Sequence, residues 1–276
     1  MPNLRIISAN YADQATRLAA STTSGALAAA LMQTDRKGEA HRSTGTSVTY
    51  TLTWTGGVSI GGVALPATNL TSAATMRVRL YDATSGGTLL LDTGTNTACP
   101  GLTAAPWTWT AVHNANAFAY GYASKAVAWF ANTAGVKRAV IDLVDTGNPA
   151  GYIDCARVVC GPWWSPEWNA EYGCTTLVVD NTTNTRSDAG DLTSDRAPMH
   201  TEHTFNLPII TPADRSELMQ IMRANGVWKP VFLSLMPSAS SAAAEQDHMV
   251  FGKRKSSPIS HPFFETYSHE MTLESW

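Results

Sequence analysis

The chain has 276 residues and a formal net charge of −3, with 44% hydrophobic and only 15% charged residues. This length can bury one large core or two ordinary ones, and two domains are the better expectation. The low charge and the lack of a Lys/Arg stripe argue against nucleic acid as a partner, because such binding needs many cations. The longest weakly polar runs, Ala26 to Met32 and Val231 to Met236, are far shorter than the roughly 20 apolar residues of a spanning helix. We therefore expect no membrane insertion, and the N-terminus lacks the pattern of a secretory signal.

The first half is predicted to form a β-sandwich of about eight strands, because short strand-like runs alternate with clusters of Gly, Pro, Asn and Asp. The run Thr75 to Tyr81 alternates apolar and polar residues, which indicates one buried and one solvated face. Turn formers at Asp82 to Gly87 separate it from Leu89 to Leu91, so these two runs predict a hairpin. A second strand, turn and strand pattern covers Ala139 to Val159. Ala26 to Met32 is the only helix that the pattern allows here, and it is short.

One motif in this half invites a catalytic interpretation. Gly57 to Gly61 matches G-x-S-x-G, the nucleophile elbow of serine hydrolases, in which a tight turn from strand to helix exposes the serine. The following residues, Gly62 to Pro66, predict another strand and not that helix. We therefore expect Ser59 to be a solvent-facing strand residue, and a serine hydrolase is the weakest functional alternative.

The stretch Gly62 to Leu70, followed by the strand that ends at Arg77 to Asp82, resembles jelly-roll sandwiches related to carbohydrate-binding and discoidin-like domains. The resemblance implies a β-sandwich accessory or interaction domain. It leaves sugar binding open, because the binding sites of such domains lie in variable loops. Trp107 and Trp109 are the candidate sugar contacts, because an aromatic ring can stack on a sugar. Their spacing of two places both on one strand face, where packing into the core is the more common use.

The second half is predicted to contain one helix among strands. Thr211 is an N-cap followed by Pro212 at the first helical position and Asp214 in the first turn, and Asn225-Gly226 provides a left-handed stop. Strands are expected at Lys229 to Leu235, at Met249 to Lys253 and at Phe264 to Leu273, with a Ser/Ala-rich loop over Pro237 to Gln246.

Between Asp180 and His203 lies a polar run rich in carboxylates, with two histidines. A metal site is one interpretation and a solvated loop is the other. The aspartates are irregularly spaced, unlike the ligands of a calcium loop. His200 and Glu202 would share one face of an extended chain while His203 points to the other, so we predict a loop that reaches a neighbouring subunit and no metal. The run contains Asp180, Asp188, Asp191, Asp195, His200, Glu202 and His203.

Four cysteines occur, at positions 99, 155, 160 and 174. Without an export signal, reduced and buried thiols are the expectation. A metal or iron–sulfur site is the alternative, but the spacing lacks the close C-x-x-C pairs of common sites. The prediction is therefore that Cys99, Cys155, Cys160 and Cys174 are reduced and metal-free.

The region from Val158 onward opens with a hydrophobic strand that ends in Gly161-Pro162-Trp163, followed by an aromatic loop, a polar loop, the helix and a final strand. In this order of elements the chain resembles minor or distal tail proteins of siphophages. The aromatic residues could cover the end of a core or lie at a subunit contact, since Trp and Tyr contribute strongly to interfaces. The candidate interface residues are Trp163, Trp164, Trp168, Tyr172, Asp191 and His200.

The resemblance implies a mainly β protein with two parts: a jelly-roll-like sandwich over residues 1–157 and a tail-tube-like module with one packed helix over 158–276. An N-terminal strand within Met1 to Asn10 could complete the second part. The expected function is that of a non-enzymatic structural subunit of a phage tail tip or baseplate, which forms a ring with itself and contacts neighbouring tail proteins. This implies assembly in the host bacterial cytoplasm and residence in the virion tail, without a cofactor or a metal. A carbohydrate-binding protein that contacts host-surface glycans is the alternative.

Overall fold

The computed structural model describes residues 3–36, 38–99, 124–197, 199–237, 245–246 and 248–275. The chain is mainly β, as predicted, with antiparallel sheets and one α-helix among the described residues. It divides into two compact units, one of Met1–Ser165 with Phe232–Met249 and one of Pro166–Val231 with Val250–Trp276. No helix of the described residues is long and apolar enough to cross a membrane.

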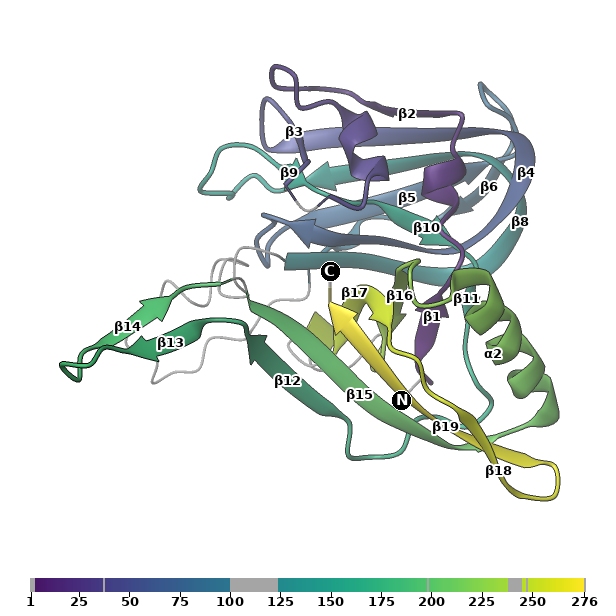
Figure 1. Ribbon diagram of the computed structural model, residues 1–276. Coiled ribbons are helices and arrows are strands. Elements are labelled where there is room, and N and C mark those ends of the chain that lie inside the picture. Colours follow the sequence, from purple (N-terminus) through teal and green to yellow (C-terminus); the bar gives the residue numbers. More distant parts are fainter. Residues whose placement is uncertain are drawn as a thin grey trace. The chain divides into compact units, whose positions relative to one another are not determined.

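The first unit is built around two long antiparallel strands, β4 (Ser47–Thr68) and β8 (Ser124–Val144). Its remaining elements are shorter, and most of them add to this pair (Figure 1). They are β1 (Arg5–Ile7), η1 (Tyr11–Gln14), β2 (Arg17–Ala20), η2 (Ala29–Gln33), β3 (His41–Arg42), β5 (Thr75–Tyr81), β6 (Leu89–Asp92), β7 (Asn96–Thr97), β9 (Asp154–Cys155), β10 (Val159–Gly161), β11 (Trp163–Trp164) and most of β16 (Val231–Ser234).

The strands β4 and β8 bend, so that their two halves contribute to two layers. Their register shifts between Thr53 and Val58 and again at Ile60 and Gly62, which are the irregularities that bend a strand. One half of β4 pairs with β2 and the other with β10, while β5 and β6 extend the sheet beyond β8. Side chains from both halves, such as Leu52 and Leu65, belong to one buried cluster. The folded-over hairpin thus closes a sandwich around a common core.

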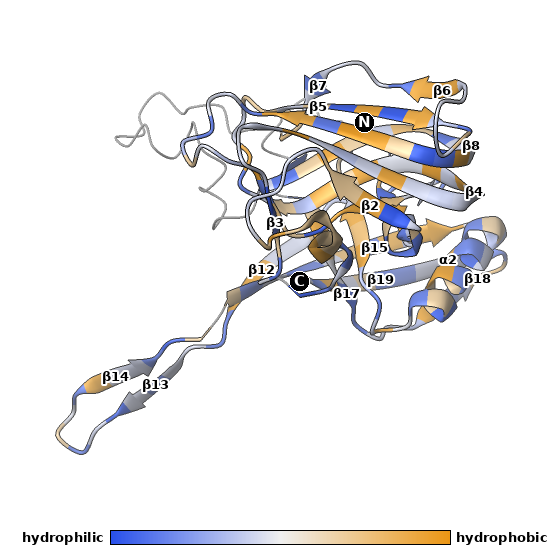
Figure 2. Cartoon of the chain, turned by 90° about the horizontal axis from the view of Figure 1, so that it is seen from above, coloured by the Kyte–Doolittle hydropathy of each residue, from blue (hydrophilic) through white to orange (hydrophobic). Residues whose placement is uncertain are grey.

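The predicted hairpin of the first half is confirmed as β5 and β6, which pair antiparallel. The buried and partly exposed residues of β5 alternate strictly, and Figure 2 shows the corresponding alternation of hydropathy along this strand. The short helix expected at Ala26 to Met32 is instead the 3₁₀ helix η2, which starts at Ala29. Tyr152 to Val159 was expected to be one strand, but it contains only β9 and the start of β10, because Ala156 and Arg157 lie between them.

Arg157 is the largest fully buried side chain of the described residues, with 2% of its side chain exposed. Its guanidinium donates to both carboxylate oxygens of Asp13, at 2.6 and 2.8 Å, and pairs with Asp35 at 2.9 Å. It also donates to the carbonyl of Met32. One buried cation thereby joins η1 and η2 to the segment between β9 and β10.

The division between the units lies after Ser165 and not after residue 157, because β10 pairs with β4 in the first unit. The approach there is close: a Cβ on Gly161 would lie 2.0 Å from the carbonyl oxygen of Ala9. The N-terminal strand β1 pairs with β11 and with β16, a strand that we had assigned to the second domain. That the halves form two separately folding domains remains a prediction.

The second unit contains a sheet in the order β17-β19-β15-β12, with β18 also paired to β19. The predicted helix is confirmed as α2 (Pro212–Asn225), with the Thr211 side chain accepting from the backbone N–H of Asp214 and Gly226 at φ 55°. The other elements are β12 (Thr175–Asp180), β13 (Thr183–Arg186), β14 (Leu192–Asp195), β15 (Met199–Ile210), β17 (Met249–Arg254), β18 (Ile259–Phe263) and β19 (Thr266–Ser275).

Candidate interaction surface

Strand β12 forms an exposed edge of the sheet in the second unit. It pairs with β15 on one side, and it stands at the end of the strand order among the described residues. Leu177 and Val178 are 57% and 60% exposed. The sequence of β12 is rich in Thr, Leu and Val, a composition that usually packs against other side chains. An edge strand of this kind can pair with a strand of another chain, because its outer backbone N–H and C=O groups lie beside apolar side chains.

A two-stranded arm, formed by β13 and β14, follows β12. The two strands pair only with each other among the described residues, and every residue in them is exposed. Figures 1 and 2 show the arm extending away from β12 and β15. An isolated hairpin is at best marginally stable in water, since it lacks a core. The arm is therefore the part of the second unit that would gain most from a partner.

The six predicted interface residues are divided between the two units. Trp163 and Trp164 are in β11 of the first unit, where the Trp163 indole donates to the carbonyl of Phe130 at 2.7 Å and the Arg5 guanidinium lies 4.4 Å from its ring centre. Trp168 and Tyr172 belong to the second unit and are 54% and 97% exposed.

Asp191 and His200, the other two, belong to the arm and to its base. Asp191 is exposed at the tip, where its N–H donates to the hydroxyl of Ser187 at 3.1 Å. His200 is the second residue of β15. These placements leave the interface roles as predictions.

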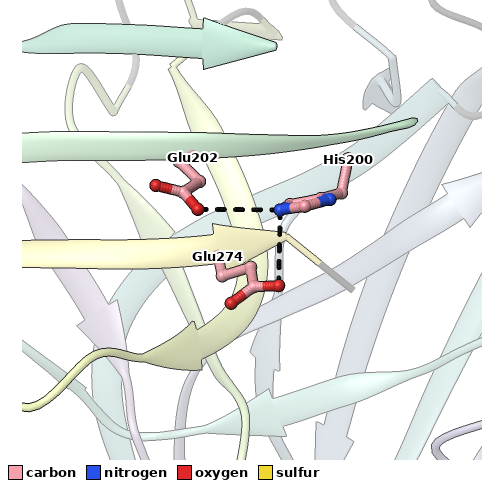
Figure 3. A group of neighbouring side chains, drawn as sticks. All are labelled: His200, Glu202 and Glu274. Carbon is pink, nitrogen blue, oxygen red and sulfur yellow. Dashed lines mark ion pairs between the residues drawn. The ribbon is translucent and has the colours of Figure 1, made fainter. Parts of the chain in front are cut away.

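His200 is close to two carboxylates on adjacent strands (Figure 3). Its Nε2 is 3.6 Å from Glu202 Oε1 and 3.3 Å from Glu274 Oε1. The ammonium of Lys255 also pairs with Glu202 and lowers the pKa of that carboxyl. His203, by contrast, is buried and pairs with the hydroxyl of Thr176 at 3.1 Å, so it lies on the opposite face as predicted. Sequence reasoning missed Glu274, because it lies 72 positions after Glu202 and only the strand pairing brings it close.

The cysteine thiols of the first unit are poor nucleophiles. Cys99, Cys155 and Cys160 are buried, and burial raises the pKa of Cys99 to about 11 and that of Cys155 to about 12. Cys174 is partly exposed, and all four thiols are free. Within the described residues, His200, Glu202 and Glu274 are close enough together to hold a metal ion, and this group contains no cysteine. Ser59 lies inside β4, so the structure places no strand-to-helix elbow at the G-x-S-x-G motif.

A cavity of about 280 Å³ lies in the first unit. Trp129 and Glu245 line it together with the polar residues Thr93, Asn96 and Thr97. The indole N–H of Trp129 donates to Glu245 at 3.2 Å, and the ring centres of Trp129 and Phe232 lie 6.0 Å apart. The predicted sugar contacts Trp107 and Trp109 lie outside the described residues, so their role stays a prediction.

No family model and no curated protein matches the chain. Among solved structures, a GH29 fucosidase of Ruminococcus gnavus in complex with fucose matches at 12% identity and a TM-score of 0.40, over 58% of this chain and 28% of the fucosidase. A family 32 carbohydrate-binding module of Clostridium perfringens in complex with galactose matches at 8% identity and 0.38, over 56% of this chain and 98% of the module. A chitosan-binding module from a Paenibacillus chitosanase/glucanase matches at 14% identity and 0.37, over 56% of this chain and 99% of the module. Likenesses at these TM-scores establish neither the family nor the function of this chain.

Proposed function

We propose that this protein is a non-enzymatic structural subunit of a phage tail tip or baseplate, which assembles with further copies of itself through the second unit. The observation that carries the proposal is the exposed edge β12 continued by the coreless arm β13–β14. The order of aromatic loop, polar segment, helix and final strand, from which we inferred a tail protein, supports the same proposal.

The physical reason is that both features are incomplete in a single chain. Among the described residues β12 pairs with a strand on one side only, and this edge, beside the exposed side chains of Leu177 and Val178, favours the addition of a strand. An arm that crosses to the next copy adds contact area, and a stable interface needs on the order of 1,000 Å² or more in total. Because the arm and the edge are different surfaces, their contact is head-to-tail, and such contacts close into rings when the rotation allows it.

The experiment is to measure the mass of the full chain by mass photometry and to look for rings by negative-stain microscopy. The double variant Leu177→Lys, Val178→Lys should give monomers, since charged side chains on an edge oppose strand addition. The matched control is Leu89→Lys, which alters an exposed leucine on β6 in the first unit and should assemble normally. A wild-type chain that stays monomeric alone and with other tail proteins contradicts the proposal, as does a double variant that assembles like the wild type.

Carbohydrate binding by the first unit is the second candidate, and the cavity beside Trp129 favours it. Its volume is near the lower end of the roughly 300–1,000 Å³ typical of small-molecule sites. Its lining combines an aromatic edge with hydroxyl, amide and carboxylate groups, which suit the hydroxyls of a sugar. The test is a glycan array with the full chain. Binding that is lost in Asn96→Ala would support carbohydrate binding, and an array without signal would contradict it.

A further inference from the structure

The cluster at the base of the arm has an unusual arrangement of charges. Glu202 of β15 and Glu274 of β19 are direct cross-strand partners, so their side chains emerge side by side on one face. Like charges in this position destabilise a sheet. His200 precedes Glu202 by two positions and therefore shares its face. The three side chains converge in Figure 3, with the imidazole nitrogen between the two carboxylates.

The distances from His200 Nε2 to the two carboxylates suit a tetrahedral metal ion, and the three ligand atoms all lie within 4.8 Å of one another. Zinc bonds to imidazole nitrogen and carboxylate oxygen at about 2.0–2.2 Å, so two ligand atoms of a tetrahedral site lie about 3.3–3.6 Å apart. The distances from His200 Nε2 to Glu274 Oε1 and Glu202 Oε1 are 3.3 and 3.6 Å. The side chains of His200 and Glu202 are only 21% and 19% exposed, and Glu274 is 47% exposed, so one side of the group remains open.

We infer that His200, Glu202 and Glu274 form a binding site for a divalent transition-metal ion of the zinc class, with the fourth position open to water or a partner's side chain. One nitrogen and two carboxylate oxygens are a donor set that zinc accepts, and the imidazole disfavours Mg²⁺ and Ca²⁺. The amide nitrogen of Asn181 lies 3.4 Å from His200 Nδ1. Metal binding through Nε2 leaves the imidazole proton on Nδ1, so the Asn181 amide would turn to present its oxygen as the acceptor and hold the ring from that side. This site goes beyond the proposed assembly function and does not depend on it.

Two lysines face this group and compete with a metal ion for the carboxylates. Lys255 pairs with Glu202. Lys253 of β17 is the cross-strand partner of Glu274, on the side of β19 away from β15. A proton on His200 Nε2 would also satisfy the two carboxylates without a metal. The two interpretations therefore predict different metal binding when Lys255 is removed. A metal-ion site should bind the ion more tightly, whereas a plain ion-pair network should bind no ion with or without the lysine.

The position of the site suggests what the ion would do. Asn181 directly follows β12 and His200 is at the start of β15, so the two residues bracket the arm in the sequence. A metal ion bound to His200 would hold the imidazole, and through it Asn181, in one arrangement. The direction in which the arm leaves the sheet would then be set by metal binding.

The experiment is titration of the full-length protein with ZnCl₂ by isothermal calorimetry, after treatment with a chelator. We expect one ion per chain, no competition from MgCl₂, and for Co²⁺ the visible absorption of a tetrahedral site. His200→Ala, Glu202→Gln and Glu274→Gln should each weaken binding by about 10-fold or more. Lys255→Met should tighten it several-fold, and the control His261→Ala, an exposed histidine of β18, should leave it unchanged.

Glu274→Gln is the decisive variant, because a chance site made of histidine and nearby surface groups would not need this distant residue. Zinc binding that is the same in wild type and Glu274→Gln overturns the inference. So does the absence of stoichiometric binding in the wild type, which would leave the cluster as an ion-pair network. Exchange of the amide hydrogens of the arm should also slow when ZnCl₂ is added, and an arm that exchanges equally fast with and without the ion contradicts the role in orienting it.

Discussion

Replacement of Asp13 by Asn tests the buried cation that joins η1 and η2 to the segment between β9 and β10. The Arg157 side chain is 2% exposed, and Asp13 accepts two of its hydrogen bonds, at 2.6 and 2.8 Å. Removing one partner of a buried ion pair typically costs 3–5 kcal/mol, because the other charge stays buried without compensation. Asp35 still pairs with the guanidinium at 2.9 Å in this variant, so we expect a loss of about 3 kcal/mol, at the lower end of that range.

Asp35→Asn is the matched control, because it removes a partner of the same guanidinium whose side chain is 46% exposed. The Asp35 carboxylate makes one contact with the guanidinium where Asp13 makes two, and its side chain is more exposed, 46% against 33%, so its loss should cost less, on the order of 1 kcal/mol. For a unit of this size, 3 kcal/mol corresponds to a fall in Tm of roughly 6–12 °C. The double variant Asp13→Asn, Arg157→Met should recover part of the stability, because it removes the buried charge as well.

The assay is urea unfolding of the full chain together with differential scanning calorimetry of its transitions. Equal losses for Asp13→Asn and Asp35→Asn would refute the argument, since they would mean that burial of the guanidinium does not decide the cost. A double variant less stable than Asp13→Asn alone would also refute it.

Three further predictions concern the thiols, the helix and pH. Cys174 should react with a thiol reagent in the native protein, whereas the three buried cysteines should react only on unfolding, because burial holds their pKa high. Thr211→Ala should cost about 1 kcal/mol by loss of the N-cap, and Thr211→Ser should cost much less, as urea unfolding would reveal. Burial lowers the pKa of His41 below its ordinary 6.5, so the folded state keeps it neutral while the unfolded chain takes up a proton below about pH 6.5. The Tm should therefore fall as the pH drops from about 7.5 to 5.5, and His41→Gln should make this fall smaller. A fall of the same size in His41→Gln would show that other groups cause the pH dependence.

The local patterns were enough to predict several elements. The alternation of Thr75 to Tyr81 and the turn formers after it predict β5, β6 and their hairpin, because each residue's environment depends on its neighbours in the chain. The start and end of α2 follow from Thr211, Pro212 and Gly226 for the same reason. The mainly β class also follows from such short-range signals.

What the sequence could not decide are the contacts between residues that are distant in the chain. Arg157 lies in a predicted strand beside the expected domain boundary, and only the fold shows it buried against Asp13, 144 positions earlier. Likewise, the pattern around His200 and Glu202 argued against a metal, because it contains only two ligands on one face. The third, Glu274, is supplied by the register of β15 with β19, and register is a property of the assembled sheet and not of either strand alone.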